Sequence, residues 1–439
     1  MALSTQPYKG ARDFYPEDKR IQKYMFKTMR KVVQRFGYEE YDAPILEPLD
    51  LYRAKTGDEI VNEQVYSFID RGDREVAIRP EMTPTVSRMV AGRRQELAYP
   101  ARWFSIPNLW RYERPQRGRL REHWQLNVDI FGVEGIEADH EIIMVSDSIM
   151  QAFKAKRDMY TIKVNSRQLM DGLLADYLGL DQVQARTMTQ LIDRMHKMDY
   201  AEFIGSLDAL FQPAQREQGE PDILLKFLEG TSLDDLPEPL QIHPSVTELR
   251  SLITMLHASG LSNVVFDPTL MRGFDYYTDI VFEVFDNHPE NNRSMFGGGR
   301  YDGLVGLFGV EPVATVGFGM GDVTLQNFLE THELLPNLYP ETDVYVILIG
   351  DVYPQAQKAL RELRESGVKL AVDITRRKPD KQIKTAVKKG IHYALFIGDR
   401  EIASEQYVLK NLITGTDEQH GINRIVSIVK DYRTKKQLK

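Results

Sequence analysis

The stretch Leu270-Met-Arg-Gly-Phe-Asp-Tyr-Tyr-Thr-Asp-Ile-Val-Phe-Glu283 indicates more about the fold and chemistry of this chain than any other segment. It places one permanent cation, one carboxylate and two adjacent phenols beside a glycine, ahead of an apolar run with period two. Such a run predicts a β-strand, and a site built on a strand is held rigidly. Because side chains alternate across a strand, we expect one of Tyr276 and Tyr277 to face a site and the other to pack in the core.

Two further segments combine charge with glycine or aromatic residues. Gly297-Gly-Gly-Arg-Tyr-Asp-Gly303 follows shortly after the predicted strand, and Arg111-Tyr-Glu-Arg-Pro-Gln116 lies far upstream. The upstream segment continues into Gly118-Arg-Leu-Arg121, so one predicted loop carries several arginines. Clustered like charges repel, which favours an anionic ligand that neutralises them. For Arg-x-Glu taken alone, a cross-strand ion pair is the simpler interpretation.

The composition is that of an ordinary globular protein. The chain has 439 residues, of which 42% are hydrophobic and 27% charged, enough for two or three domains. No run approaches the roughly 18 apolar residues of a membrane span, and the first ten residues do not resemble a signal peptide. Cysteine is absent and the nine histidines are scattered, which excludes disulfides and thiolate zinc sites. We therefore expect a cytoplasmic protein with no fixed metal site and no membrane partner.

The net charge of −8 is unevenly distributed along the chain. From Glu341 onward there are 19 Lys and Arg against 13 Asp and Glu, a net of +6, whereas the preceding residues carry 37 against 51, a net of −14. A basic segment on an acidic body fits local contact with a polyanion. A solvated basic face would account for the charge equally well.

The first 330 residues combine strand and helix patterns. Pro16 opens a long helical pattern that stops at Gly37, and residues 38–47 form a strand-like segment broken by Pro44. Residues 105–132 predict two antiparallel strands joined by a charged loop. The pattern from about 160 to 230 is helical and predicts an insertion, after which strand patterns return at 263–266, 280–285 and 314–317.

The chain changes character after the prolines at 336 and 340, which predict a linker. Strands and short helices then alternate, a pattern typical of a mostly parallel sheet. The expected strands are 343–349, 368–374 and 391–397, and the expected helices are 354–365 and 381–389.

Together, these segments resemble the histidyl-tRNA synthetase family of class II synthetases. The resemblance rests on Arg-Gly-Phe-Asp-Tyr-Tyr, Gly-Gly-Arg-Tyr-Asp-Gly-Leu and the arginine-rich loop. It implies an α+β catalytic domain at 1–330, built on an antiparallel sheet with a helical insertion at about 170–240. It further implies a linker at 331–341, an anticodon-binding α/β domain with a mostly parallel mixed sheet at 342–439, and a homodimer. The implied enzyme activates histidine with ATP and Mg²⁺ and transfers it to tRNA(His).

The resemblance also implies roles for individual residues. Arg111 and Arg272 would be catalytic and would clamp the α-phosphate from two sides, which would stabilise developing charge. Histidine would be bound by Glu81, Thr83, Gln125, Asp129, Tyr276, Tyr277 and Tyr301. ATP would be bound by Arg111, Glu113, Arg119, Arg121, His123 and Arg272. The tRNA would be contacted by Gln116, Arg376, Arg377 and Lys378.

Three positions depart from the family pattern. Thr324 stands where the third class II motif has an arginine that covers adenine and reaches the γ-phosphate. His123 replaces the phenylalanine often found against adenine, and Asp129 replaces a glutamate. The Gly317-x-Gly-x-Gly spacing does not predict a dinucleotide site, because no β-α-β unit surrounds it. The residue that replaces the missing arginine cannot be deduced from the sequence.

Two other functional classes remain open at this stage. One is a non-catalytic relative, the synthetase-like regulatory subunit of ATP phosphoribosyltransferase in histidine biosynthesis, which Thr324 weakly favours. Arg111, Arg272, Glu81 and the intact C-terminal segment favour the enzyme. The other is a generic ATP-binding interaction protein, which the amino-acid pocket disfavours.

Overall fold

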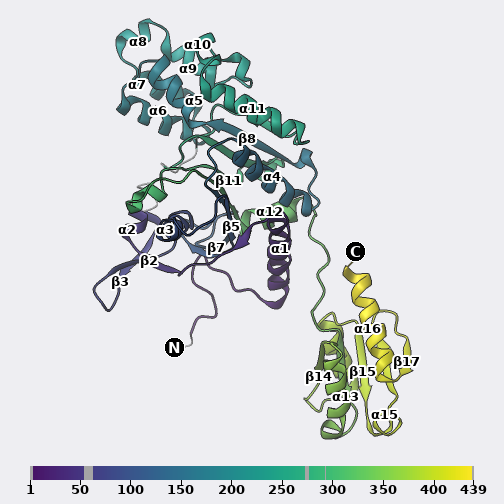
Figure 1. The fold of residues 1–439 in the computed structure, drawn as a ribbon. Helices are drawn as coiled ribbons and strands as arrows, with labels where there is room; N and C mark the ends of the chain where they lie inside the picture. Colours follow the sequence, from purple (N-terminus) through teal and green to yellow (C-terminus); the bar gives the residue numbers. More distant parts are fainter. Residues whose placement is uncertain (1–2, 54–62, 272–275, 292, 438–439) are drawn as a thin grey trace. The chain divides into compact units, whose positions relative to one another are not determined.

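A computed structural model describes residues 3–53, 63–271, 276–291 and 293–437. The chain divides into two compact units. The first contains the residues up to Phe14 and Gln22–Leu335, and the second contains Tyr15–Ile21 and the chain from Pro336 onward. The ribbon in Figure 1 follows the chain through both units. Among the described residues, no helix combines the length and the apolar character that crossing a membrane requires.

A nine-stranded sheet forms the centre of the first unit. Its order is β1-β5-β7-β12-β11-β10-β8-β9, with β6 paired to β7 alone. The pairs from β5 to β8 are all antiparallel, whereas β1 and β9 join the two edges in parallel. The strands are β1 (Glu39–Glu40), β5 (Ala101–Ser105), β6 (Asn108–Trp110), β7 (Glu122–Phe131), β8 (Tyr160–Ser166), β9 (Val264–Phe266), β10 (Ile280–Asp286), β11 (Ser294–Arg300) and β12 (Thr315–Gly321).

Helices and a smaller sheet complete this unit. Helix α1 (Pro16–Arg35) begins with proline, whose fixed φ suits the first helical position; its residues up to Ile21 belong to the second unit. The part of α1 in the first unit buries the apolar face formed by Met25, Met29, Val32 and Val33. The small antiparallel sheet has the order β2-β4-β3. Its strands are β2 (Leu46–Pro48), β3 (Tyr66–Ile69) and β4 (Glu75–Ile78). Further helices of this unit are α2 (Asp50–Arg53), α3 (Thr83–Arg93), α4 (Glu137–Ala152) and α12 (Asp322–Thr331).

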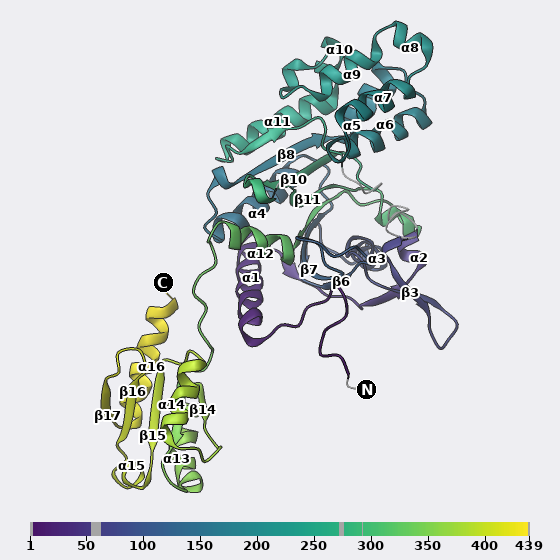
Figure 2. The same cartoon turned by 180° about the vertical axis from the view of Figure 1, so that it is seen from behind.

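A group of helices lies between β8 and β9 in the sequence and gathers beside β8 in both ribbon views (Figures 1 and 2). Two of these helices begin at aspartates, Asp181 and Asp199, whose carboxylates accept hydrogen bonds from the first backbone N–H groups. The helices are α5 (Arg167–Asp171), α6 (Gln182–Arg194), α7 (Tyr200–Leu210), α8 (Pro213–Glu217), α9 (Glu220–Leu228), α10 (Glu238–Gln241) and α11 (Pro244–Ala258).

The second unit contains a five-stranded mixed sheet with the order β14-β13-β15-β16-β17. Strands β14, β13 and β15 are parallel, and β16 and β17 continue the sheet in antiparallel pairs. Alternation along β13 sends Val344 and Val346 into one buried cluster and Tyr345 and Ile347 into another, so both faces of the sheet are covered. The elements are β13 (Val344–Leu348), α13 (Tyr353–Glu365), β14 (Leu370–Val372), α14 (Pro379–Lys388), β15 (Tyr393–Ile397), α15 (Asp399–Ser404), β16 (Tyr407–Asn411), β17 (Asp417–His420) and α16 (Ile422–Gln437).

The expected fold class is confirmed, with local differences. The hairpin expected within 105–132 is β6 and β7, an antiparallel pair joined by the arginine-rich loop. The strand expected at 368–374 is shorter, because only Leu370–Val372 pairs with β13. The expectation of a helical pattern from residue 160 was wrong for Tyr160–Ser166, which form β8. The helices that follow run from Arg167 to Ala258, beyond the expected end of the insertion near residue 240.

Candidate functional site

Strand β7 directs three polar side chains into one cavity. Gln125, Asn127 and Asp129 line this cavity, while the intervening Leu126 and Val128 are fully buried on the other face of the strand. This is the two-residue alternation of a β-strand. The sequence analysis identified Gln125 and Asp129 and missed Asn127, although its position between them would have indicated it. The side chain of Asn127 donates to the backbone oxygen of Gln125 at 3.0 Å.

Glycines of β11 and β12 leave room for the cavity. A Cβ atom at Gly317 would overlap the carboxylate of Asp129, and one at Gly319 would overlap the amide of Gln125. A side chain at Gly299 would meet the ring of Tyr277. Glycine in a central strand loses more backbone entropy than other residues do, so its use here indicates close approach of neighbouring groups. The first two glycines of the Gly-x-Gly-x-Gly pattern, Gly317 and Gly319, therefore have a steric role: they make space for polar side chains on the adjacent strand.

Asp129 has one hydrogen-bonded carboxylate oxygen and one without a partner. The Tyr301 hydroxyl donates to Oδ1, whereas Oδ2 is buried with no hydrogen-bond partner among the described residues. Burial raises the pKa of Asp129 to about 7, and the hydrogen bond from Tyr301 opposes this rise. A buried oxygen without a partner is destabilising, so the cavity suits a ligand that donates a hydrogen bond to this atom.

Tyr276 and Tyr277 both line the cavity, contrary to the expectation that only one would do so. The reason is that β10 begins at Ile280, so strand alternation does not govern these two residues. Their rings lie 4.9 Å apart, and the Tyr276 ring lies 5.7 Å from that of Tyr301. The Tyr276 hydroxyl also donates to the buried carboxylate of Glu81 at 3.3 Å.

Glu81 and Thr83 reach the same cavity from the segment that leads into α3. Buried Arg79 positions this segment, because its guanidinium donates to the backbone oxygens of Asn108 at 3.1 Å and Ala43 at 2.6 Å. A carboxylate and a hydroxyl at one end of the cavity can accept hydrogen bonds from an ammonium group.

Arg111 follows β6 and lines the cavity. Its Nε donates to the backbone oxygen of Pro80 at 2.8 Å, and its backbone N–H donates to the Arg121 oxygen at 2.8 Å. These contacts fix the base of the guanidinium beside the residues that precede α3. Arg111 therefore supplies a permanent positive charge to a cavity that also contains Glu81 and Asp129.

His123 precedes Gln125 on the same face of β7. Burial lowers the pKa of His123 to about 3, and the positive charges of Arg111 and Arg12 lower it further. The ring is therefore neutral at physiological pH. A flat, neutral ring between cationic groups can stack on a planar ligand without repelling those cations.

The other predicted ATP-site residues lie on the loop between β6 and β7. The Arg121 guanidinium stacks 3.8 Å from the Tyr112 ring centre and donates to the Glu113 backbone oxygen at 3.1 Å and to the Tyr8 hydroxyl at 3.0 Å. Arg119 is exposed and lies 3.6 Å from the Glu113 carboxylate. The backbones of Gln116 and Arg119 pair with each other at the tip of the loop. Arg272 lies outside the described residues.

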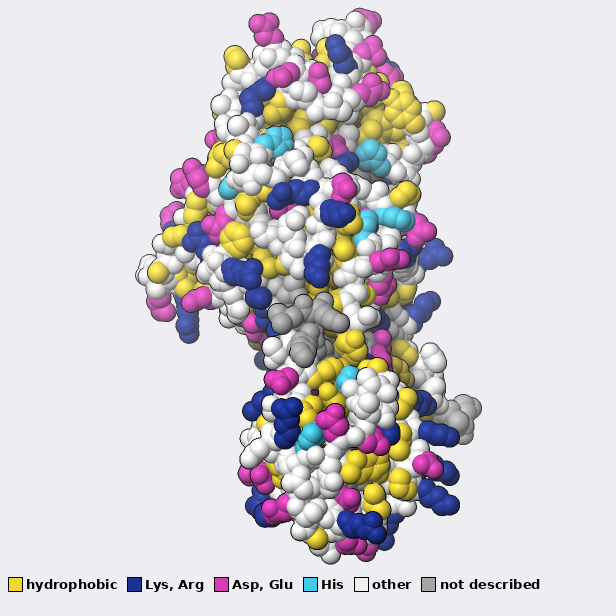
Figure 3. Space-filling model, turned by 90° about the vertical axis from the view of Figure 1, so that its right-hand side faces the viewer, with side chains coloured by type: hydrophobic (Ala, Val, Ile, Leu, Met, Phe, Trp, Pro, Cys, Tyr) yellow, Lys and Arg dark blue, Asp and Glu magenta, His cyan; other side chains and the backbone are white. Residues whose placement is uncertain are grey.

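The basic residues of the second unit follow β14. Arg376 is 85% exposed and lies 3.4 Å from Asp351, while Arg377 pairs with the buried carboxylate of Asp373 at 2.9 Å. Lys378 is exposed immediately before α14. Exposed Ile374 accompanies them. On the face displayed in Figure 3, Lys and Arg side chains in dark blue are interspersed with acidic ones in magenta.

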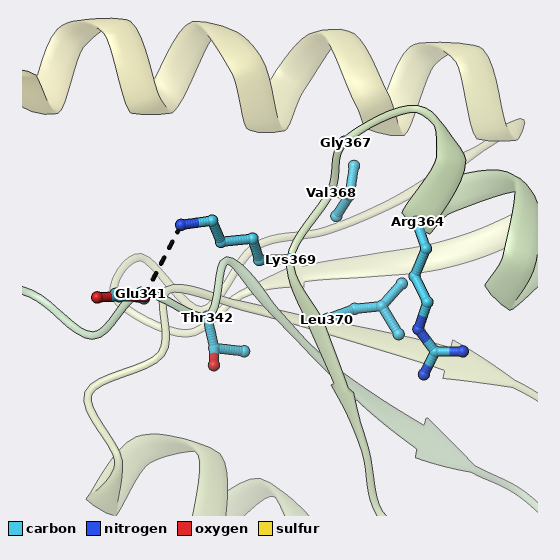
Figure 4. A pocket seen from close by; sticks show the side chains of 7 residues that line it. All are labelled: Glu341, Thr342, Arg364, Gly367, Val368, Lys369 and Leu370. Carbon is cyan, nitrogen blue, oxygen red and sulfur yellow. Dashed lines mark ion pairs between the residues drawn. The ribbon is translucent and has the colours of Figure 1, made fainter. Parts of the chain in front are cut away.

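A second cavity, of about 490 Å³, lies within the second unit (Figure 4). It is bordered by Glu341, Thr342, Arg364, Gly367, Val368, Lys369 and Leu370. Lys369 is 3.9 Å from Glu341, so its charge is partly balanced. The cavity lies where β13 and β14 begin, at the opposite end of these strands from Arg376. None of the predicted site residues borders it.

Comparisons with known proteins agree with the arrangement in the first unit. Residues 10–322 match the family model for histidyl-tRNA synthetase, and residues 343–432 match that for an anticodon binding domain. The histidine–tRNA ligase of Leptospira biflexa is 44% identical over 99% of both chains, and that of Thermoplasma volcanium is 36% identical over 95% of this chain and 96% of its own. The fold resembles that of histidyl-tRNA synthetase from Nostoc, with a TM-score of 0.81, 23% identity and coverage of 98% of this chain and 100% of that one. This chain belongs to the histidyl-tRNA synthetase family.

Proposed function

We propose that this protein is a histidine–tRNA ligase. It joins the carboxylate of histidine to the α-phosphate of ATP and expels pyrophosphate. It then transfers the histidyl group to the 3′ end of tRNA(His) and releases AMP. The observation that supports histidine as the amino-acid substrate is the buried Oδ2 of Asp129, which has no hydrogen-bond partner among the described residues. Of the common side chains, neutral imidazole is the one that can donate from one ring nitrogen and accept at the other.

The imidazole is held between Asp129 and the phenols of the cavity. One ring N–H donates to Asp129, and the hydroxyl of Tyr277 donates to the other ring nitrogen. The hydroxyl of Tyr301 stays on Asp129, and its ring contacts the imidazole. A site whose buried polar groups need both partners rejects analogues that leave them unpaired, by about 10⁴–10⁵-fold in favourable cases. Selection of histidine therefore depends on hydrogen bonding more than on the volume of the cavity.

The opposite end of the cavity holds the reacting group. Glu81 and Thr83, with help from Gln125 and Tyr276, hold the α-ammonium and thereby orient the carboxylate towards ATP. Arg111 binds the α-phosphate, and the family resemblance assigns the same phosphate to Arg272, which lies outside the described residues. Both guanidinium groups remain charged throughout the reaction, so they stabilise the charge that develops at phosphorus without a proton transfer.

ATP enters as its Mg²⁺ complex and is held by the loop between β6 and β7. The Glu113 carboxylate accepts from the adenine amino group, and the His123 ring stacks on the base. Arg119 and Arg121, on the same loop, complete the ATP-binding surface. The contact between Arg119 and Glu113 and the stacking of Arg121 on Tyr112 support the roles of these arginines in shaping the loop.

The tRNA contacts both units. Gln116 at the loop tip meets the acceptor end, while Arg376, Arg377 and Lys378 contact phosphates near the anticodon. We assign residues 1–330 to catalysis, 331–341 to the linker and 342–439 to anticodon binding. The functional assembly is a homodimer, and the enzyme acts in the cytoplasm. The match of residues 343–432 to the anticodon binding domain favours the enzyme over the regulatory-subunit alternative.

Histidine-dependent exchange of radiolabelled pyrophosphate into ATP tests this assignment, with and without tRNA(His). The enzyme should show exchange with histidine alone and attach histidine to tRNA when both are present. Exchange that is equally rapid with another amino acid, or the absence of any exchange, would exclude the ligase. Histidine binding without exchange would instead support the regulatory subunit.

A further inference from the structure

The N-terminal segment is fixed against the start of β7, where the site begins. The backbone oxygen of Gly10 accepts from the N–H groups of Arg121 at 2.9 Å and Glu122 at 3.1 Å. Gly10 has a φ of +86°, and a Cβ there would lie 2.7 Å from the Arg121 Cγ. Only glycine suits both the backbone conformation and this close approach. The segment thus has a defined path beside β7, and two residues later it delivers Arg12.

Arg12 reaches the end of the glycine-containing strand β12. Its Nη2 donates to Asp322 Oδ2 at 2.7 Å, and Asp322 is the first residue of α12, directly after β12. Asp322 is fully enclosed, and its other carboxylate oxygen accepts from the backbone N–H of Trp124 at 3.0 Å. One buried carboxylate therefore connects the arginine to both strands that form the cavity, β7 and β12.

The guanidinium of Arg12 is held in position, but not all of its N–H donors have hydrogen-bond partners among the described residues. It lies 4.9 Å from the centre of the Phe14 ring, which packs edge-on against Trp124 at 5.2 Å. Its Nε is buried and has no hydrogen-bond partner among the described residues. An arginine has five N–H donors in a planar fork, and Asp322 engages Nη2, so the guanidinium retains the capacity to bind an anion as well. Arg12 also lies close enough to His123 for its charge to oppose protonation of that ring, as Arg111 does.

Thr324, the third residue of α12, contributes no charge here. Its hydroxyl donates to the backbone oxygen of Met295 at 2.8 Å, so the side chain is used to attach the helix to β11. Its methyl group faces Gly118, at 3.5 Å from the position of a Cβ there. The positive charge that reaches the start of α12 comes instead from Arg12, which is distant in sequence.

We infer that Arg12 is an ATP-binding residue that contacts the phosphates beyond the α-phosphate, with Asp322 as its positioning residue. The inference rests on the proposed function. It adds Arg12 at the β- and γ-phosphates to the arginines that the proposed function assigns to the reacting α-phosphate, Arg111 and Arg272. The buried pair with Asp322 keeps the guanidinium in place before ATP arrives, which lowers the entropic cost of binding.

The test replaces Arg12 by methionine, which keeps the length and removes the charge, and by lysine. In pyrophosphate exchange, Arg12→Met should raise the KM for ATP by about 10- to 100-fold, the scale of losing a charge-assisted hydrogen bond. The KM for histidine should change less than about twofold, and Arg12→Lys should recover part of the loss because it keeps a positive charge. Inhibition by AMP, which lacks the outer phosphates, should be unchanged.

Arg157→Met is the matched control, because Arg157 also pairs with a buried aspartate, Asp147, at 2.9 Å. It should leave the KM for ATP unchanged. Equal weakening of ATP, AMP and histidine in Arg12→Met would assign Arg12 a structural role and overturn the inference, as would an unchanged KM for ATP. If the unmodified enzyme shows no exchange, the proposed function fails. In that case, calorimetric titration with a non-hydrolysable ATP analogue still compares the affinities of the unmodified protein and Arg12→Met, and so tests the inference separately.

Discussion

The hydroxyl of Tyr301 donates to one carboxylate oxygen of Asp129, while the other oxygen of Asp129 is buried without a partner among the described residues. The phenol thus orients the carboxylate and leaves one acceptor available for the substrate. Tyr301 lies beyond β11 and Asp129 on β7, so the pair connects two segments that are distant in sequence. The same pair gives histidine binding a dependence on pH.

The first prediction concerns pH. Burial raises the pKa of Asp129 to about 7, so the neutral acid is favoured in the free enzyme below that pH. The ionised form is the better acceptor for an imidazole N–H, so kcat/KM for histidine should fall about tenfold per pH unit below 7. In Asp129→Asn this ionisation should disappear and leave only the titration of the substrate. Profiles of kcat/KM between pH 5.5 and 8.5 provide the measurement. An identical inflection in both proteins would remove Asp129 from the explanation.

The same pKa shift also makes stability depend on pH, but in the opposite direction: stability should rise as pH falls, whereas kcat/KM for histidine should decrease. Because the folded-state pKa of Asp129 is raised, ionisation favours the unfolded chain, and this carboxyl lowers stability as pH rises from about 4 to above 7. Asp129→Asn should therefore gain stability relative to the unmodified protein over that interval. Denaturant unfolding at pH 5 and pH 8 measures the difference. A stability difference that does not change between the two pH values would contradict the assigned shift.

The second prediction concerns substrate selection. Asp129→Ala should raise the KM for histidine by about 10- to 100-fold, since a buried N–H without a partner costs about 1–3 kcal/mol. The KM for ATP should change much less, because the proposed function assigns Asp129 to the imidazole of histidine and not to ATP. Steady-state pyrophosphate exchange measures both constants. Equal increases in both would indicate general damage to the fold.

The third prediction concerns the glycines of β12. Gly319→Ala places a methyl group where the Gln125 amide lies, so it should displace that side chain and cost about 1–3 kcal/mol of stability. Histidine binding should weaken together with stability. Gly205→Ala on α7 is the control, because no atom lies within 4 Å of its added Cβ. Thermal unfolding and histidine titration of both variants give the comparison. A Gly319→Ala enzyme with normal affinity would show that Gln125 can move freely.

The fourth prediction concerns the α-phosphate. Arg111→Ala should lower the rate of histidyl-adenylate formation by about 10²–10³-fold, the loss typical of one preorganised transition-state donor. Arg111→Lys should remain impaired, because an ammonium cannot reproduce the planar fork of the guanidinium. Single-turnover formation of adenylate at saturating substrates separates this effect from binding. An adenylation rate close to normal would argue against the assignment.

The fifth prediction concerns tRNA. The double variant Arg376→Ala, Lys378→Ala should charge tRNA more slowly at low tRNA concentration while adenylate formation stays normal. Each lost phosphate contact should reduce the slope of log K against log salt by about 0.7 to 0.9. Lys358→Ala, which removes an exposed lysine paired with Glu405 at 2.9 Å on α13, is the control. A salt dependence unchanged from that of the unmodified protein would place the tRNA elsewhere.

Local sequence patterns predicted much of the fold. The features that were not predicted depend on contacts between residues that are distant in sequence. The hairpin of β6 and β7 and the alternating second unit depend on periodicity and turn residues, which the sequence displays directly. The prediction that only one of Tyr276 and Tyr277 would face the site was wrong, because β10 begins only at Ile280. The pairing of Arg12 with Asp322 joins residues 310 positions apart, and no local pattern indicates it.

The candidate site was also predicted in part from the sequence. Glu81, Gln125, Asp129 and Tyr301 were assigned by resemblance, and the structure brings them together. Asn127 was missed, although strand alternation alone would have included it. The purpose of the glycines was also missed, since a glycine shows what it makes room for only when the neighbouring strand is in place.

The glycines of β11 and β12 also limit how this site can change by mutation. Glycine has no side chain to remove, so every substitution at Gly317 or Gly319 adds atoms to the space occupied by Asp129 and Gln125. This wall of the cavity can evolve only towards a smaller ligand. A variant that accepts a larger amino acid must gain its volume from the aromatic side, by truncation of Tyr276, Tyr277 or Tyr301. Directed libraries for new substrates should therefore vary the tyrosines and keep the glycines constant.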